Sequence, residues 1–286
     1  MNETLLKPMK AGLIGSGIQA SLTPAMHMRE GEAQGFSYEY ELIDLSQIGA
    51  TPEDLPRLLD EAEARGLSGL NITYPCKQSV IAFLDDLSPQ ARDLGAVNTV
   101  VLRDGKRHGH NTDWWGFAES FREGLPHADL SSALQLGAGG AGAATAYALL
   151  SLGLRSLLIF DRETERAASL AQTMTALFPD TVIEVAHDLG AAMQAVAGLV
   201  HATPTGMAKY PGLPLPADLL SPRHWVAEVV YFPLETALLR EARRRGCQTL
   251  DGGGMAVYQA VGAFRLFTRR EPDAARMLVH FNTLAR

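Results

Sequence analysis

A lysine and an aspartate are the first side chains in this sequence whose surroundings suggest chemistry. Lys77 ends the stretch NITYPCK, in which an apolar, strand-like run breaks at Pro75, and Asp113 follows Asn111 and Thr112 in HGHNTDWWGF. Ligands of α/β proteins bind at the carboxyl ends of strands, so an ammonium group placed there can serve a reaction. Taken singly, each residue also has an ordinary explanation: Lys77 as an exposed lysine in the first turn of a helix, and Asp113 as a helix N-cap.

A glycine-rich stretch, GAGGAG, is the second candidate site, and it follows the apolar run Ala133–Leu136. Gly137, Gly139 and Gly142 match the pattern G-x-G-x-x-G. The first glycine permits a tight strand-to-helix turn, the second lets a pyrophosphate approach the backbone, and the third lets the helix pack closely on the strand. The phosphates would lie at the positive end of the helix. This context favours a dinucleotide site over a glycine-rich turn without a ligand.

An acid and a base at the end of the next strand bear on the choice of cofactor. Asp161 follows the run SLLIF, and Arg162 comes next. A carboxylate at this position accepts hydrogen bonds from the ribose hydroxyls of NAD and repels the 2′-phosphate of NADP. Arg162 could hold that phosphate, or it could stack on the adenine. Because the acid at the strand end is the stronger signal, we expect NAD to be preferred over NADP.

The elements that would position these residues alternate between strand-like and helix-like patterns. The predicted strands are 11–15, 38–45, 67–75, 133–136 and 156–160, and the runs LVHATPTGM, HWVAEVVY and RGCQTLDGG each contain a further strand that enters a loop. The predicted helices in the first half include 25–35, 52–66 and 78–87, and a hairpin turns at Asp104–Gly105. This rhythm predicts an α/β fold with two lobes, each built on a mostly parallel sheet covered by helices.

Composition narrows the function classes. The 286 residues carry 25 basic and 32 acidic side chains, for a net charge of −7, with no cluster of Lys and Arg that would suit nucleic acid. Cys76 and Cys247 are the two cysteines, and no Cys/His spacing resembles a metal site. No stretch is long and apolar enough for a membrane span, and the first residues lack the features of a signal peptide. We therefore expect a cytoplasmic protein without a metal, nucleic-acid or membrane partner, and a homodimer is one possible oligomeric state.

Eight motifs occur in an order that resembles the shikimate dehydrogenase family, including its quinate/shikimate members. They are SLTPAMH, NITYPCK, GAVNTVV, NTDWWGF, GAGGAG, TPTGM, VVYFPLETALL and GGGMAVYQA, and together they extend over nearly the whole chain. The resemblance implies that residues 1–117 bind a cyclic polyol acid, that 118–255 form a Rossmann domain for a nicotinamide cofactor, and that 256–286 pack back on the first domain. It implies reversible hydride transfer between NAD and the C3 hydroxyl of shikimate or quinate, giving 3-dehydroshikimate or 3-dehydroquinate.

The resemblance also assigns residues to roles. Lys77 and Asp113 match the family's catalytic pair beside the reacting hydroxyl. The ammonium group can stabilise charge on that oxygen and relay its proton, and the carboxylate can hold the lysine; either residue could move the proton. The implied substrate-binding residues are Ser21, Thr23, Thr73, Asn98, Tyr231 and Gln259. The implied cofactor-binding residues are Gly137, Ala138, Gly139, Gly140, Ala141, Gly142, Asp161, Arg162, Thr203 and Gly254.

Several positions depart from the family pattern. Gly17 and Ala20 replace its usual proline and histidine, and His201 stands where asparagine is common. The ordinary interpretation of His201 is a loop histidine without a role. Thr23 resembles the residue of dual-specificity members and predicts that quinate is accepted, although Ser21 and Thr23 could also form a helix cap. Asn71 is expected to shape its loop. Two alternatives remain: a relative acting on another hydroxylated ring acid such as aminoshikimate, and a non-catalytic NAD-binding regulator.

Overall fold

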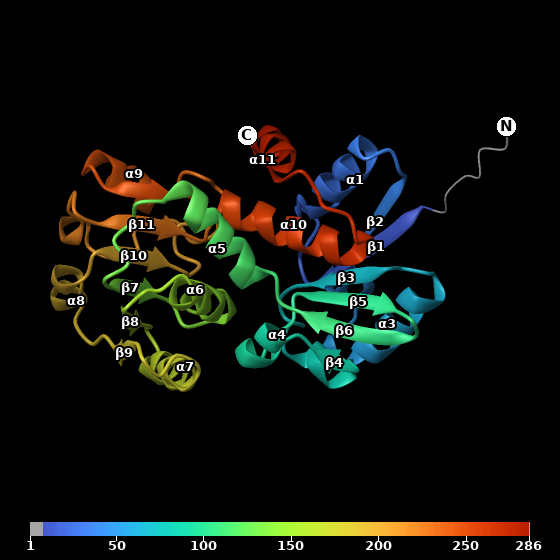
Figure 1. The fold of residues 1–286 in the computed structure, drawn as a ribbon, viewed down its shortest axis with the longest axis horizontal. Helices are drawn as coiled ribbons and strands as arrows, with labels where there is room; N and C mark the ends of the chain where they lie inside the picture. Colours follow the sequence, from blue (N-terminus) through green and yellow to red (C-terminus); the bar gives the residue numbers. More distant parts are fainter. Residues whose placement is uncertain (1–7, 286) are drawn as a thin grey trace. The chain divides into compact units, whose positions relative to one another are not determined.

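Two six-stranded sheets organise the chain, one in each of two α/β units (Figure 1). The structure is a computed structural model that describes residues 8–285. The first unit contains residues 8–112 together with Gln259–Leu284, and the second contains Asp113–Tyr258.

The sheet of the first unit is mixed. Its strands are β1 (Met9–Gly15), β2 (Tyr38–Asp44), β3 (Gly69–Ile72), β4 (Asp86–Leu87), β5 (Thr99–Arg103) and β6 (Lys106–His110), in the order β2-β1-β3-β5-β6-β4. Strands β2, β1 and β3 are parallel, whereas β5 is antiparallel to both β3 and β6. The helices are α1 (Thr23–Ala33), α2 (Leu45–Ile48), η1 (Pro52–Asp54), α3 (Leu55–Ala64), η2 (Ser79–Phe83), α4 (Pro89–Leu94), most of α10 (Gly253–Thr268) and α11 (Ala274–Leu284).

Successive side chains along each strand point to opposite faces of this sheet, and the two faces pack in different hydrophobic cores. Ile14 and Leu70 pack in one core with the buried stripe of α3, whose members are Leu55, Leu58, Leu59 and Ala62. This spacing places the stripe on one side of a helix. The opposite face carries Ala11 and packs against Phe264 and Phe267 of α10. Gly69 permits this packing, since a Cβ there would lie 2.2 Å from Cε1 of Phe267.

The second sheet is entirely parallel. Its strands are β7 (Ala133–Leu136), β8 (Ser156–Phe160), β9 (Val182–Val185), β10 (Gly198–His201), β11 (Trp225–Glu228) and β12 (Gln248–Leu250). Its helices are α5 (Asp113–Gly124), α6 (Gly140–Ser151), α7 (Thr164–Leu177), α8 (Leu189–Ala195), η3 (Ala217–Leu219) and α9 (Ala237–Arg244). The order β12-β11-β10-β7-β8-β9 is that of a doubly wound dinucleotide-binding sheet, with its switch point beside β7. The labels β11 to β9 follow this order down the left of Figure 1.

The predicted α/β class is confirmed, and so are the strands Ala133–Leu136 and Ser156–Phe160 and the hairpin turn at Asp104–Gly105. The helix predicted over 78–87 is wrong. Residues Ser79–Phe83 form a short 3₁₀ helix, and Asp86–Leu87 pair as β4 with β6. Within residues 8–285, no helix is long and apolar enough to cross a membrane.

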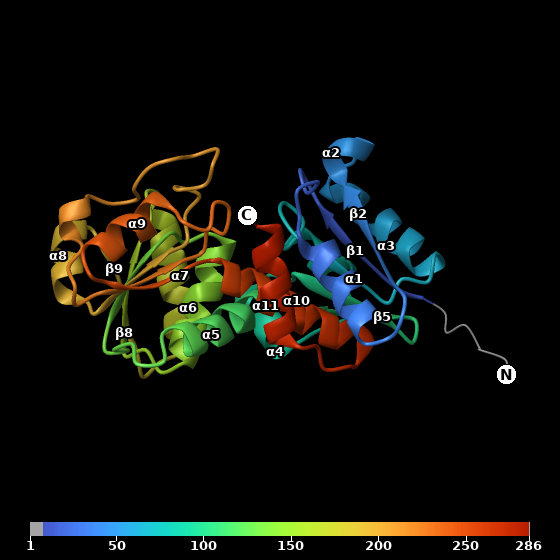
Figure 2. The ribbon, with the colours of Figure 1, turned by 90° about the horizontal axis from the view of Figure 1, so that it is seen from above.

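A buried acid ties α11 to α1 within the first unit, where the two helices lie side by side (Figure 2). Glu30 is 1% exposed and accepts hydrogen bonds from Nε and Nη2 of Arg276 at 2.8 and 2.7 Å. Its carboxylate also accepts from the backbone N–H of Asp273 and from Gln34. Burial alone would raise the pKa of Glu30, but the hydrogen bonds from Arg276, Asp273 and Gln34 hold it below its ordinary value.

Candidate functional site

Predicted substrate residues in the first unit lie around the carboxyl end of β3. Thr73 follows that strand directly, and the backbone N–H of Ile72 donates to the carbonyl oxygen of Asn98 at 2.7 Å. The N–H of Val97 donates to the carbonyl oxygen of Lys77 at 2.8 Å. The fold therefore brings Thr73, Lys77 and Asn98 to one edge of the sheet, with Thr73 and Lys77 partly exposed.

Asn98 is held by hydrogen bonds that also reach Gln259. Its Oδ1 accepts from the N–H of Thr112 at 2.7 Å, and its Nδ2 donates to Oγ1 of Thr112 at 2.9 Å. The Thr112 hydroxyl donates in turn to the carbonyl oxygen of Gln259 at 3.0 Å. Asn98 is 3% exposed, so this network fixes both its side chain and the start of the α10 segment that belongs to the first unit. Thr112 had no predicted role.

Asn71 lies inside β3, within the strand predicted over 67–75, so it acts on the neighbouring loop from the strand itself. It is buried, and its Nδ2 donates to Oγ1 of Thr99 at 3.1 Å and to the carbonyl oxygen of Asn98 at 3.3 Å. Its Oδ1 accepts from the hydroxyl of Tyr40 at 2.7 Å. A buried amide must satisfy both ends, and these bonds do so while holding the backbone of Asn98, just before β5.

The loop that leads to Ser21 and Thr23 is fixed by Asp44 at the end of β2. The carboxylate accepts from the backbone N–H groups of Gly17 and Ile18 at 2.9 and 3.1 Å. Side-chain hydrogen bonds from Ser46 and Gln19, together with these backbone bonds, hold the pKa of Asp44 well below its ordinary value. Gly17 has φ of +69°, a backbone conformation that disfavours other residues and is closed to the family's usual proline.

Ser21 and Thr23 stand at the beginning of α1 and are both partly exposed. The Ser21 hydroxyl accepts from the N–H of Thr23 at 3.3 Å. Leu22, the N-cap residue, gives no side-chain cap. The start of α1 therefore presents two partly exposed hydroxyls at the positive end of the helix, which suits an anionic group.

Asp113 and Tyr231 belong to the second unit. Asp113 is the first residue of α5 and is partly buried. A carboxylate in a first helical turn is favoured by the positive end of the helix. Tyr231 follows β11 in a loop, where it is 44% exposed and is succeeded by the more exposed Phe232.

The glycine-rich turn between β7 and α6 has the geometry that a pyrophosphate requires. Gly137 has φ of +102°, and a Cβ there would lie 2.6 Å from the carbonyl oxygen of Ala202. A Cβ on Gly142 would lie 2.3 Å from the carbonyl oxygen of Gly137, whereas nothing lies within 4 Å of one on Gly139. Gly139 thus faces open space at the helix N-terminus, where phosphates bind. Buried Gln135 donates to the carbonyls of Gly137 and Gly142 and clamps the turn.

Asp161 sits at the edge of this turn. Its Oδ2 accepts from the N–H of Ala138 at 2.8 Å, and its Oδ1 accepts from the N–H of Glu163 at 2.9 Å. Each oxygen retains further acceptor capacity for a ribose hydroxyl. Arg162 is exposed. The remaining predicted positions of the turn, Ala138, Gly140 and Ala141, supply backbone at the start of α6.

Gly254 lies where α10 crosses α5 within the second unit. A Cβ on Gly254 would lie 2.1 Å from Oγ of Ser120, so close helix packing by itself requires glycine there. Its predicted cofactor role stays a prediction.

His201 is the last residue of β10 and is fully buried, so the interpretation as a loop histidine without a role is wrong in its placement. Its Nδ1 lies 2.9 and 3.0 Å from the two carboxylate oxygens of Glu228, and its Nε2 lies 2.5 Å from Oγ1 of Thr203. Sequence reasoning missed Glu228. A lone acid inside the apolar run HWVAEVVY was the available signal, because a buried charge needs a partner.

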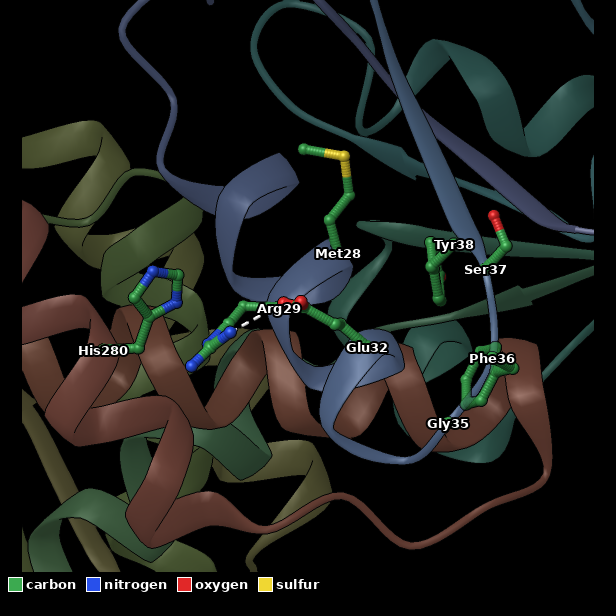
Figure 3. A pocket seen from close by; sticks show the side chains of 8 residues that line it. All are labelled: Met28, Arg29, Glu32, Gly35, Phe36, Ser37, Tyr38 and His280. Carbon is green, nitrogen blue, oxygen red and sulfur yellow. Dashed lines mark hydrogen bonds and ion pairs between the residues drawn. The ribbon is translucent and has the colours of Figure 1, made fainter.

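A surface pocket in the first unit contains none of the predicted site residues (Figure 3). Its lining residues are Met28, Arg29, Glu32, Gly35, Phe36, Ser37, Tyr38 and His280. Arg29 and Glu32 form an exposed ion pair across one side of it. Among residues 8–285, no group of three or more His, Cys, Asp or Glu side chains is placed to hold a metal ion.

Comparison with known proteins gives consistent matches. Residues 13–100 match the family described as shikimate dehydrogenase substrate binding domain. A shikimate dehydrogenase (NADP(+)) of Streptomyces avermitilis is 58% identical over 96% of this chain and 95% of its own. A quinate/shikimate dehydrogenase (NAD(+)) of Corynebacterium glutamicum is 48% identical over 99% of this chain and 100% of its own. The solved structure of quinate dehydrogenase from Corynebacterium glutamicum in complex with NAD has a TM-score of 0.92 at 47% identity, covering 96% of this chain and 99% of that one.

Proposed function

Because the chain belongs to the shikimate dehydrogenase family, whose members are oxidoreductases acting on CH–OH groups, we propose that it transfers a hydride reversibly between a nicotinamide cofactor and the C3 hydroxyl of shikimate or quinate. The observation that carries the proposal is the gathering of Thr73, Lys77 and Asn98 at the carboxyl end of β3. It occurs in a chain that matches these dehydrogenases over nearly its full length.

Lys77 and Asp113 are proposed as the catalytic pair. When bound, the cofactor supplies the hydride acceptor or donor. As the alcohol is oxidised, its oxygen loses a proton and accumulates negative charge, and the Lys77 ammonium group stabilises that charge by a charge-assisted hydrogen bond. Asp113 shares the substrate hydroxyl and orients the lysine, so that the pair together carries the proton between oxygen and solvent.

The remaining polar residues orient the ring acid. We assign Ser21, Thr23 and Tyr231 to the substrate carboxylate, in keeping with the two hydroxyls at the beginning of α1. Thr73, Asn98 and Gln259 are assigned to the ring hydroxyls. Quinate carries one more hydroxyl than shikimate, on the carbon that bears the carboxylate, and we propose that the pocket accepts both.

We further propose that NAD is preferred over NADP. Support comes from Asp161 at the end of β8, whose charge disfavours a 2′-phosphate, and from the two relatives of Corynebacterium glutamicum that are named for NAD or bind it. The relative of Streptomyces avermitilis is named for NADP. Exposed Arg162 is the residue on this chain that would support that alternative.

The test is turnover by the purified protein, followed by the absorbance of the reduced nicotinamide. Shikimate, quinate and an amino-substituted shikimate are each supplied with NAD and with NADP. Turnover of shikimate or quinate with greater efficiency for NAD is expected. Turnover of the amino-substituted acid alone would favour a diverged relative. Binding of NAD without turnover of any ring acid would replace the proposal with a non-catalytic regulator.

A further inference from the structure

Glu228, His201 and Thr203 form a hydrogen-bonded series at one edge of the second sheet, and we propose that this series fixes the direction of the Thr203 hydroxyl proton at the cofactor site. The inference rests on the cofactor-binding role proposed for Thr203. It makes His201 and Glu228 positioning residues, since both act through Thr203.

The strand register places this series beside the glycine-rich turn. His201 pairs with Glu228 of β11 on one side and with Leu136 of β7 on the other. Gly137 follows Leu136 directly, and a Cβ on that glycine would lie 3.0 Å from Cγ2 of Thr203. Thr203 therefore packs against the first glycine of the turn predicted to bind the pyrophosphate.

The donors around Glu228 decide which nitrogen of His201 carries hydrogen. The carboxylate is fully buried and accepts from the N–H groups of Val229 and Val230 at 2.9 and 3.0 Å, and from the hydroxyl of Thr236 at 3.0 Å. A carboxylate acts as an acceptor at both oxygens. His201 Nδ1, at 2.9 and 3.0 Å from those oxygens, is therefore the fourth donor.

A hydrogen on Nδ1 leaves Nε2 of the neutral ring as an acceptor. Thr203 must then donate its hydroxyl proton to Nε2, across the 2.5 Å contact. The N–H of Thr205 donates to the same hydroxyl oxygen at 3.3 Å. With its proton committed to His201, Thr203 offers the cofactor a lone pair rather than a hydrogen. It suits a donor such as the nicotinamide carboxamide N–H or a ribose hydroxyl, and it does not suit a phosphate oxygen.

A double-mutant cycle on cofactor binding tests this arrangement. The dissociation constants of NAD and NADP, without any ring acid, are measured for the parent, Thr203→Val, His201→Leu and the double variant. Thr203→Val should weaken binding by about 3- to 10-fold in the parent, the usual range for one hydrogen bond. In the His201→Leu background, Thr203→Val should change the dissociation constant by less than about twofold, because the Thr203 hydroxyl is no longer oriented.

Thr205→Val is the matched control, since its backbone rather than its side chain joins the series; it should have equal effects in both backgrounds. An undiminished effect of Thr203→Val in the His201→Leu background overturns the proposal, as does no effect in the parent. Because binding is measured without ring acid, failure of the proposed enzymatic function would appear separately, as absent turnover with intact binding.

Nitrogen-15 NMR of the histidine rings tests the same inference in the parent protein. His201 should show a protonated Nδ1 and an unprotonated Nε2. The resonance is assigned by its shift in Thr203→Val, which removes the hydrogen bond to Nε2. A protonated Nε2 would overturn the proposal whether or not the His201→Leu variant folds.

Discussion

Replacing Asp161 by asparagine removes one negative charge from the cofactor site and leaves its shape unchanged. A 2′-phosphate bound beside the turn would lie within a few ångströms of the carboxylate. At about 4 Å and an effective dielectric of about 20, two unit charges repel by roughly 4 kcal/mol. Asp161 is only partly buried, so water and salt reduce this to about 1–2 kcal/mol. The variant should therefore shift the NADP/NAD efficiency ratio toward NADP by about tenfold.

Asp161 also accepts backbone hydrogen bonds, and their loss is expected to change the efficiency in a way that differs from the loss of charge. Asparagine keeps one acceptor oxygen, so either the N–H of Ala138 or that of Glu163 loses its partner. Losing this hydrogen bond destabilises the turn by about 0.5–1.5 kcal/mol, and it lowers kcat/KM equally for both cofactors. The efficiency with NAD should thus fall while the ratio rises, which distinguishes lost repulsion from a distorted turn.

The assay is kcat/KM for both cofactors at saturating ring acid. Asp129→Asn is the control, because that carboxylate also accepts a backbone N–H, at 2.8 Å from Ser131, but precedes β7 and so lies toward the opposite ends of the strands. The control should leave the ratio unchanged. An unchanged ratio in Asp161→Asn would refute the reasoning and transfer cofactor choice to Arg162.

Three further outcomes are expected. Lys77→Ala should lower kcat by about 10²- to 10⁴-fold in a steady-state assay, whereas the control Lys106→Ala, at an exposed lysine, should leave kcat unchanged. A kcat of Lys77→Ala within a few-fold of the parent would remove Lys77 from the catalytic pair. Gly137→Ala should lower the free energy of unfolding by about 1–3 kcal/mol, because the φ of Gly137 is +102°. Gly139→Ala should keep the free energy of unfolding of the parent but lose affinity for the cofactor, because a Cβ there meets only open space. Equal free energies of unfolding for the two variants would contradict the assigned geometry. Burial lowers the pKa of His27 to about 3, so protonation of the unfolded chain at this residue should reduce the free energy of unfolding by about 1.4 kcal/mol per pH unit as pH falls from about 6.5 toward about 3. Urea unfolding of His27→Leu should show a slope shallower by that amount, and an equally steep slope would refute the assignment.

The architecture of the second unit could be predicted because its signals are local. An apolar run followed by Gly137 marks the end of β7, and a run followed by Asp161 marks the end of β8. In each case the residue that ends the strand is also the residue proposed to meet the cofactor. Local sequence therefore predicts the strands, which the structure confirms, and at the same residues it predicts the cofactor site.

Features that depend on pairing between distant segments could not be predicted in this way. The apolar residues of Ser79–Phe83 suit an α-helix or a 3₁₀ helix equally, and it is the pairing of Asp86–Leu87 with β6 that limits the helix to one short segment. His201 and Glu228 are 27 residues apart, and only the register of β10 with β11 brings them together. The amide of Asn71 bonds Tyr40 and Thr99, which are 31 and 28 residues away, and only the assembled sheet brings these partners together.

The contact between Glu30 and Arg276 also imposes an order on folding during synthesis. The two residues are 246 positions apart. At about 5–20 residues per second, a ribosome needs roughly 12–50 seconds to travel between them. All of the second unit emerges during that interval. Until α10 and α11 follow, Glu30 of α1 lacks its arginine partner, and the sheet face that carries Ala11 lacks Phe264 and Phe267 to cover it. The unit whose sheet is translated first is therefore the last to complete its core.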